Sequence, residues 1–303
     1  MDFFFDPAIK RKSAHISSAL SRNTHGRAPL PGVVEVSESG TCNRKCSFCP
    51  RSDPNYPDIK EFIAPALLHK LSAELGELGF GGIFLFSGFV EPLLDKNIYQ
   101  HIRTVSSNIP NARVEMVTNG DVLNEARLLK LFENGLTTLL ISVYDSAEDA
   151  ERFEQMCIKA DLSEHQFVIR HRYLPPEEDF GITLSNRAGA MSNAEFVIDD
   201  AVEPLREPCF YPSYTFFMDY NGDVLLCPHD WKKAKVVGNL TDQSFSEIWL
   251  GKGFMGARKS LKCGDRTKAP CQRCDVKGTL IGKEHADAWE KLSENTEPQN
   301  SNA

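Results

Sequence analysis

Along the first two thirds of the chain, short apolar runs alternate with segments in which apolar residues recur every three or four positions. Runs of the first kind are typical of buried strands, and the second spacing is typical of helices with one apolar face. The pattern predicts strands at residues 33–36, 82–86, 113–117, 137–143, 166–170 and 182–185, and helices at residues 64–78, 98–105, 125–132 and 148–160. It therefore predicts an α/β fold with a parallel sheet and outer helices, either open or curled into a partial (β/α)6 barrel.

The pattern changes after about residue 195. Strands predicted at residues 214–220 and 223–226 flank Asn221-Gly222, which is a strong hairpin signal, and a helix is predicted at 245–261. We therefore expect a small C-terminal α+β appendage. The expected parts are an N-terminal arm or short helix at residues 1–30, the α/β part at 31–195, the appendage at 196–285 and a tail at 286–303, disordered from residue 293.

The composition is that of an ordinary globular protein. Hydrophobic residues make up 41% of the 303 residues, which is enough for a sizeable core, and charged residues make up 25%. The net charge is −8 and no block of lysine and arginine stands out, so a nucleic-acid partner is disfavoured. The apolar runs are too short to span a bilayer, and the start of the chain lacks the pattern of a secretory signal. We therefore expect no membrane partner and a cytoplasmic location.

Nine cysteines indicate metal binding, because disulfide frameworks belong to small secreted domains. Cys42, Cys46 and Cys49 form a C-x3-C-x2-C motif directly after the first strand. Three thiolates can hold three corners of a [4Fe–4S] cluster, and the open fourth corner is then available for chemistry. A structural zinc site or three unrelated thiols is the alternative, although zinc loops usually supply paired CxxC motifs.

This motif, with Phe48 just before the third cysteine, resembles that of the radical S-adenosylmethionine (SAM) superfamily. Residues 86–92 (FSGFVEP) resemble the glycine/glutamate motif of the family, although Val90 stands where glycine is usual. The resemblance implies that Ser87, Gly88 and Glu91 bind the methionine part of SAM, with the Glu91 carboxylate paired to its ammonium group.

Polar residues at the ends of later strands also match the region where the family binds the rest of the cofactor. These residues are Asn119, Ser142, Asp145 and Arg170. Carboxyl ends of barrel strands are where such enzymes place their sites, although each residue alone could equally be a turn or cap residue. The resemblance implies that one electron from the reduced cluster splits SAM, and that the resulting 5′-deoxyadenosyl radical abstracts hydrogen from a substrate.

Four later cysteines, Cys209, Cys227, Cys271 and Cys274, suit a second site. Their spacing alone fits structural zinc and a second cluster equally well. The surrounding segments at residues 222–227, 237–239 and 248–249 resemble the shortened SPASM appendage called a twitch domain. That resemblance implies one auxiliary [4Fe–4S] cluster, fully ligated by cysteine, that serves as an electron carrier.

Two further residues are candidates for catalysis. Arg187 follows the last predicted strand and could meet the substrate in a cleft between the two parts, although it could equally make a structural salt bridge. Cys263 is left unused by the four-ligand count and could donate a hydrogen atom to a substrate radical, although it could also be an incidental thiol. A hydrogen-atom donor at this position favours epimerisation of the substrate, so we place epimerisation slightly ahead of dehydrogenation. Cys157 reads as a core thiol, and His229 as a neighbour of the second site.

The resemblance extends to the substrate class. Small family members with one auxiliary cluster include an aminocyclitol dehydrogenase and an epimerase of aminoglycoside biosynthesis. The resemblance therefore implies a polar small-molecule substrate such as a sugar, aminocyclitol or glycoside. It also implies an electron donor such as flavodoxin or ferredoxin. The alternatives are modification of a ribosomal peptide or protein, maturation of another metalloenzyme, and a zinc-stabilised binding module without catalysis.

Overall fold

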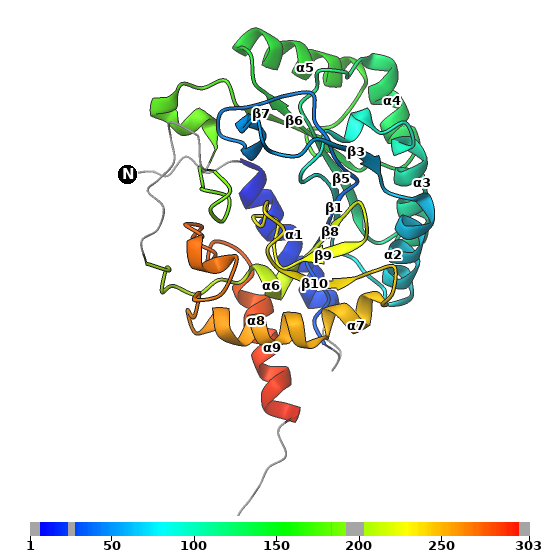
Figure 1. The fold of residues 1–303 in the computed structure, drawn as a ribbon. Helices are drawn as coiled ribbons and strands as arrows, with labels where there is room; N and C mark the ends of the chain where they lie inside the picture. The colour runs from blue at the N-terminus through cyan, green and yellow to red at the C-terminus, as the bar shows by residue number, and fades with distance from the viewer. Residues whose placement is uncertain (1–6, 24–27, 183, 192–202, 297–303) are drawn as a thin grey trace, which may run out of the picture.

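A curved eight-stranded sheet forms the centre of the molecule in the computed structural model, which describes residues 7–23, 28–182, 184–191 and 203–296 (Figure 1). The strand order is β10-β9-β8-β1-β4-β5-β6-β7, and the six strands from β8 to β7 are parallel. The strands are β1 (Val33–Ser37), β4 (Ile83–Phe86), β5 (Arg113–Thr118), β6 (Thr138–Val143), β7 (Phe167–His171), β8 (Thr215–Asp219), β9 (Asp223–Leu225) and β10 (Val236–Asn239). The predicted α/β fold with a partial barrel is therefore confirmed.

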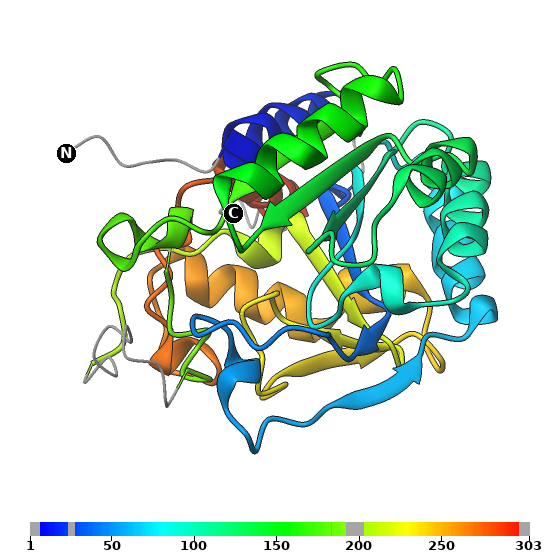
Figure 2. The same ribbon diagram turned by 90° about the horizontal axis from the view of Figure 1, so that it is seen from above.

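Helices cover the outer, convex side of this sheet (Figure 2). They are α2 (Pro65–Glu77), α3 (Ile98–Asn108), α4 (Glu125–Glu133) and α5 (Ala147–Lys159). Alternate strand residues such as Val34 and Val36 belong to the core beneath these helices, together with Leu71 of α2. Because strand side chains alternate between faces, Glu35 and Ser37 point to the opposite, inner side of the barrel. The inner side is where the candidate site lies.

The predicted strand at 182–185 is wrong. Residue 182 lies in a bend, residues 184 and 185 have no regular structure, and residue 183 is outside the described part. Arg187, Ala188 and Gly189, which follow, all have positive φ angles of 50°, 52° and 80°, so the chain turns there. The sixth parallel strand is β8 from the C-terminal part, which pairs with β1 in the register Val36↔Met218.

The C-terminal part extends the sheet. Strands β8 and β9 form the predicted hairpin, with Gly222 at a φ of 86° in its turn, and β10 adds to β9. The predicted helix at 245–261 is two helices, α7 (Phe245–Trp249) and α8 (Lys252–Lys262), because Gly251 between them has an extended conformation. A short helix α6 (Tyr211–Tyr214) leads into β8. The predicted boundary at residues 195 and 196 lies outside the described residues.

Both ends of the described chain are helical. An arm or short helix was predicted at the N-terminal end, and the helix is what the structure shows there, whereas a tail was predicted where α9 lies. α1 (Pro7–Asn23) buries Ile16, and its Arg11 pairs with Glu115 of β5 at 2.6 Å. α9 (Lys283–Thr296) buries Trp289, whose indole N–H donates to the carbonyl oxygen of Ser213. Each helix has a narrow apolar stripe, which periodicity alone did not reveal. In the described part of the chain, no helix has the length and apolar character needed to cross a lipid bilayer.

Minor elements complete the chain. A hairpin formed by β2 (Ser39–Gly40) and β3 (Ile59–Phe62) brackets the loop that carries the first three cysteines. The 3-10 helices are η1 (Pro50–Ser52), η2 (Pro92–Leu94), η3 (Pro176–Gly181) and η4 (Cys271–Arg273).

Candidate active site

The first three cysteines share one loop at the carboxyl end of β1. Cys42, Cys46 and Cys49 are all partly buried, and the Cys49 N–H donates to the Cys46 carbonyl at 3.0 Å. Burial, and then the neighbouring Cys49 and Cys42, raise the pKa of Cys46 to about 12. The thiols therefore interact electrostatically, and a bound cluster would have to supply the positive charge that keeps them as thiolates. This donor set fits three corners of an iron–sulfur cluster.

Two arginines fix this loop from opposite sides. Arg51, which is only 7% exposed, donates to the carbonyl oxygens of Gly40 and Phe89, the latter at 2.8 Å. Arg44 makes bidentate contacts to Asp121 and Asp145, which follow β5 and β6. Since Phe89 belongs to the segment 86–92, the cysteine loop is fastened to that segment and to two neighbouring strand ends.

Glu91 connects the segment after β4 to the end of β5 through hydrogen bonds. Its carboxylate accepts from Thr118 Oγ1 at 2.6 Å, the Asn119 N–H at 2.7 Å and the Leu93 N–H at 3.1 Å. A carboxylate has about four acceptor positions, so one remains for a further donor such as an ammonium group. Burial raises the pKa of Glu91 to about 7, and the three hydrogen bonds partly offset this rise. A bound cation would lower the pKa further and so favour the ionised form.

Gly88 and Ser87 lie in the same segment and face the barrel interior. Gly88 has a φ of 102°, and a Cβ there would lie 2.9 Å from Ser37 Cβ and 3.0 Å from the Phe217 ring. Only glycine therefore fits between these two side chains. The Ser87 hydroxyl hydrogen bonds with Glu35.

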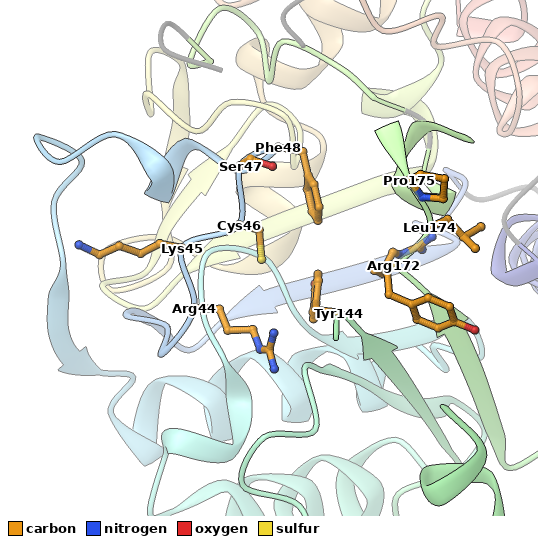
Figure 3. Close-up of a pocket in the computed structure, with 10 residues that line it drawn as sticks. Arg44, Lys45, Cys46, Ser47, Phe48, Tyr144, Arg172, Leu174 and Pro175 are labelled. Carbon is orange, nitrogen blue, oxygen red and sulfur yellow. The ribbon is translucent and has the colours of Figure 1, made fainter. Parts of the chain in front are cut away.

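A cavity of about 440 Å³ lies beside Cys46, and Phe48 is the one predicted cofactor residue of the described chain that lines it (Figure 3). Phe48 and Tyr144 line it with their rings nearly parallel and their centroids 6.0 Å apart. Ser142 is buried and hydrogen bonds with Tyr144, whereas Asp145 is mostly exposed and bonded to Arg44. The aromatic faces and polar strand ends provide both stacking and hydrogen-bonding surfaces.

Asn119 and Arg170 lie at the edges of this region. The Asn119 amide donates to Asn43 Oδ1 at 2.7 Å, so it faces the cysteine loop. Arg170 is the registered partner of Ser142 across β6 and β7. The structure thus brings the predicted cofactor residues to one end of the parallel sheet.

The second group of cysteines lines one small cavity, which also borders Tyr211 and His229. Its thiols are those of Cys209, Cys227, Cys271 and Cys274. The pKa of Cys227 is raised by burial and then by the charges of the other three cysteines. Four thiols around one cavity fit a fully cysteine-ligated cluster. Among the described residues, no three histidine, cysteine, aspartate or glutamate side chains converge on one metal ion. A cubane places each thiolate on a separate iron atom.

Arg266 holds the segments that carry these cysteines. It is 2% exposed and donates to the carbonyl oxygens of Glu207 at 2.9 Å, Pro208 at 3.0 Å and Val276 at 2.8 Å. The first two acceptors precede Cys209, and the third follows Cys274. One buried guanidinium therefore ties both ends of the ligand set together.

A polar interior lies between the two groups of cysteines. Glu35 projects into it, and burial raises the pKa of Glu35, whereas Lys12, Ser87, Arg170 and Arg187 lower it. Burial raises the pKa of Cys49 in the first group, and the positive charge of Arg187 acts against that shift. Burial and then the charge of Arg187 lower the pKa of His229 beside the second group. The charge of Arg187 therefore acts on residues at both groups. Its buried Nε has no hydrogen-bond partner.

The loop that carries Arg187 is fastened to the second group. The backbone N–H of Asn186 donates to Asp275 Oδ2 at 2.8 Å, and its side-chain amide donates to the Arg273 carbonyl at 2.7 Å. These bonds hold Arg187 and Ala188 in the left-handed region, which non-glycine residues rarely adopt. Such a conformation persists only where the surroundings impose it.

Cys263 is not brought together with the other candidates. It is exposed at the carboxyl end of α8 and lines neither cavity. His229 Nε2 hydrogen bonds with the Tyr211 hydroxyl at 3.0 Å beside the second group, in agreement with the prediction for a neighbour of that site. Cys157 is a fully buried core thiol of α5, as predicted.

Sequence reasoning missed four residues of this region: Glu35, Arg44, Tyr144 and Arg266. Glu35 had a usable signal, since a charged residue inside the buried strand VVEVS needs a polar interior. Arg44, Tyr144 and Arg266 act through partners far away in the sequence, which no spacing reveals.

Comparison with known proteins agrees with this geometry. Residues 37–168 match the family model of the radical SAM superfamily, and residues 209–275 match that of SPASM, an iron–sulfur cluster-binding domain. The S-adenosyl-L-methionine-dependent 2-deoxy-scyllo-inosamine dehydrogenase of Niallia circulans is 31% identical over 247 residues, which are 81% of this chain and 93% of the relative. The chain belongs to the radical SAM superfamily. This radical SAM enzyme uses SAM and two [4Fe–4S] clusters, as predicted.

Solved structures support the same assignment. The crystal structure of BtrN in complex with AdoMet and 2-DOIA is 29% identical and superimposes with a TM-score of 0.70, covering 86% of this chain and 99% of that one. The structure of anSMEcpe with bound AdoMet has a TM-score of 0.53 at 14% identity, covering 88% and 96% of the two chains, and shows a shared fold. The predicted radical SAM enzyme with a SPASM-type domain is confirmed, and the zinc-stabilised binding module is wrong.

Proposed function

We propose that this radical SAM enzyme oxidises an alcohol group of a small polar ring compound of the aminocyclitol class. The observation that carries the proposal is a set of charged side chains inside the barrel. Glu35 is buried on β1, and Arg187 has a buried Nε without a hydrogen-bond partner in the loop that is fastened to the second group of cysteines. Arg170 and Arg187 both interact electrostatically with Glu35. Fixed charges of both signs suit a compound with hydroxyl and amino groups. The dehydrogenase relative of Niallia circulans, named for 2-deoxy-scyllo-inosamine, supports the same class.

We assign each group of cysteines to one cluster. Cys42, Cys46 and Cys49 hold the cluster that cleaves SAM, and the four later cysteines hold the auxiliary cluster. When bound, the clusters and SAM supply a 5′-deoxyadenosyl radical that removes a hydrogen atom and an acceptor for the second electron of the oxidation.

In this proposal the protein residues bind SAM and orient the substrate. Glu91 holds the ammonium group of SAM with its remaining acceptor position, together with Ser87 and Gly88. Phe48, Asn119, Ser142 and Asp145 surround the rest of the cofactor, with Arg170 at the edge of the substrate. Arg187 orients a substrate oxygen, because it carries a buried donor without a partner.

Oxidation is favoured over epimerisation by the position of Cys263. A hydrogen-atom donor must reach the substrate radical, and this thiol is exposed at the end of α8. The slight preference for epimerisation that rested on this cysteine therefore loses its support.

We further propose a cytoplasmic enzyme that receives electrons from a flavodoxin or ferredoxin. Reducing conditions keep seven cysteines available as ligands, and the low potentials of iron–sulfur clusters match those small donors.

The test is turnover under anaerobic conditions. Reconstituted enzyme, with about eight irons for two cubanes, is incubated with SAM, a reductant and a panel of aminocyclitols that carry deuterium at the carbinol carbon. We expect deuterium in 5′-deoxyadenosine and a ketone product. An epimerised product in which a solvent hydrogen has replaced the deuterium, or stimulation by peptides alone, contradicts the proposal.

Cysteine variants test the assignment of the clusters. Replacing Cys42, Cys46 and Cys49 by alanine together should lower the iron content from about eight to about four and abolish SAM cleavage. The Cys263→Ala variant should form the same product at the same rate. Retention of SAM cleavage in the triple variant contradicts the cluster assignment. Loss of activity in Cys263→Ala would show that this thiol takes part in the reaction.

A further inference from the structure

One arginine in the first cysteine loop joins three segments of the barrel. Arg44 lies between Cys42 and Cys46, and its Nε donates to Asp121 Oδ2 at 2.8 Å. Its Nη1 donates to Asp145 Oδ1 at 2.9 Å, and its Nη2 reaches the second oxygen of each aspartate at 2.5 Å. The guanidinium thus uses both of its edges, each on a carboxylate from a different strand end.

The two carboxylates are themselves held in place. The Asp121 N–H donates to Asn119 Oδ1 at 2.9 Å, and Asn43 Nδ2 donates to Asp121 Oδ2 at 2.7 Å. Asn119 in turn donates to Asn43 at 2.7 Å, which closes a ring of contacts between the loop and the end of β5. Asp145 precedes Ser146, the N-cap of α5, so the second contact reaches the end of β6.

An isolated exposed ion pair contributes little, so the surroundings of Arg44 decide its importance. Its side chain is 22% exposed, that of Asp121 is 26% exposed and that of Asp145 is 59% exposed. Arg44 makes a bidentate contact to each aspartate. Bidentate contacts within a network are the case in which such pairs do fix a structure.

We propose that Arg44 is a positioning residue that holds the first cysteine loop against the ends of β5 and β6. The inference rests on the proposed assignment of Cys42, Cys46 and Cys49 to the SAM-cleaving cluster. Since Asp145 also belongs to the proposed cofactor site, the same contact aligns the cluster with the strand end that faces SAM. Residues that orient metal ligands in this way govern how firmly the metal is held.

The test measures iron retention and SAM binding in the reconstituted enzyme. Arg44→Gln removes both bidentate contacts, and Arg44→Lys keeps the charge but cannot make them. We expect both variants to lose the iron of the first cluster to a chelator about tenfold faster than the wild type and to bind SAM more weakly in equilibrium dialysis. The auxiliary cluster should keep its release rate, which shows that the protein is folded.

Two controls separate positioning from a general effect. Arg152→Gln breaks an exposed arginine–aspartate pair on α5, with its N···O distance of 2.9 Å, and should match the wild type in both measurements. In the background that lacks Cys42, Cys46 and Cys49, Arg44→Gln should leave the release of the remaining iron unchanged. An effect in that background, or wild-type iron release and SAM binding in Arg44→Gln, overturns the inference.

The proposed function and this inference fail in different ways. If the triple cysteine variant retains about eight irons, the cluster assignment is wrong whatever Arg44 does. If the triple variant behaves as expected but Arg44→Gln holds iron and SAM normally, only the positioning role is wrong.

Discussion

Glu38 follows β1 directly and is buried, and its carboxyl oxygens have no hydrogen-bond partner beyond the residue's own backbone. Burial raises its pKa well above the ordinary value of 4.5, and the nearby Asp95 and Glu91 raise it further. The folded protein therefore keeps this carboxyl group protonated at a pH where the unfolded chain ionises it. Its contribution to stability is fully present below about pH 4.5 and decreases as the pH rises toward the folded-state pKa.

We expect Glu38→Gln to stabilise the protein increasingly as the pH rises. The amide has nearly the same shape and cannot ionise, so it avoids a cost of about 1.4 kcal/mol per pH unit above the unfolded pKa. Chemical denaturation at pH 5 and pH 7 should therefore give a larger stability difference between variant and wild type at pH 7 than at pH 5. The exposed Glu61→Gln variant should show no such growth. An equal difference at both pH values contradicts the raised pKa.

At the scale of single residues, the sequence predicted those site residues that form a motif with a recognisable spacing. The C-x3-C-x2-C motif and the later four cysteines could be found because their chemistry depends on neighbours along the chain. Arg44 and Arg266 could not be found, because their partners lie up to about a hundred positions away and are set by folding. The exposure of Cys263 likewise depends on how α8 packs.

At the scale of elements, Arg266 joins the segment before α6 to the segment after η4. We expect Arg266→Met to lower stability by about 3–5 kcal/mol, because three carbonyl oxygens lose their common donor. The auxiliary cluster should be lost, so the iron content of the reconstituted protein falls from about eight to about four.

A matched variant is available close by. Arg206 is almost fully exposed and pairs only loosely with Glu203, so Arg206→Met should keep both clusters. Iron analysis together with denaturant unfolding checks both variants. An Arg266→Met protein with a full complement of iron shows that the three carbonyl contacts do not hold the ligands.

Strands and helices of the α/β part were predictable because each has a regular apolar pattern against a common core. The strand predicted at 182–185 was wrong, since its apolar residues precede a turn with three positive φ angles. The division of residues 245–261 into α7 and α8 depends on one glycine, and a glycine inside a helical pattern does not by itself end a helix.

For the whole molecule, α9 closes the C-terminal part. Arg258 of α8 lies between the rings of Trp249 and Trp289, 4.0 Å and 3.8 Å from their centroids, and Trp289 is almost fully buried. We expect Trp289→Ala to lower the free energy of unfolding by about 3–5 kcal/mol, because a large buried ring is removed. Anaerobic denaturant unfolding followed by circular dichroism measures this change. Leu280→Ala, at a half-exposed position, should change stability by less than about 0.5 kcal/mol.

The joining of the two parts could not be read from the sequence. A composition change near residue 195 suggested an appendage, and the family matches at 37–168 and 209–275 also fall on either side of it. Nevertheless, β8 pairs with β1 along all five residues of that strand, so one sheet crosses both parts. Apolar runs predict that a strand exists, and they carry no information about which distant strand it will join.

The pairing of β1 with β8 also sets the order in which the enzyme can mature. During synthesis, β1 and its three cysteines leave the ribosome long before β8, so one edge of β1 stays without its partner until most of the chain has been made. An unpaired strand edge invites association with other chains, and contacts between distant segments form slowly. Cells that make this enzyme therefore gain from chaperones that shield the nascent edge until β8 has paired with β1.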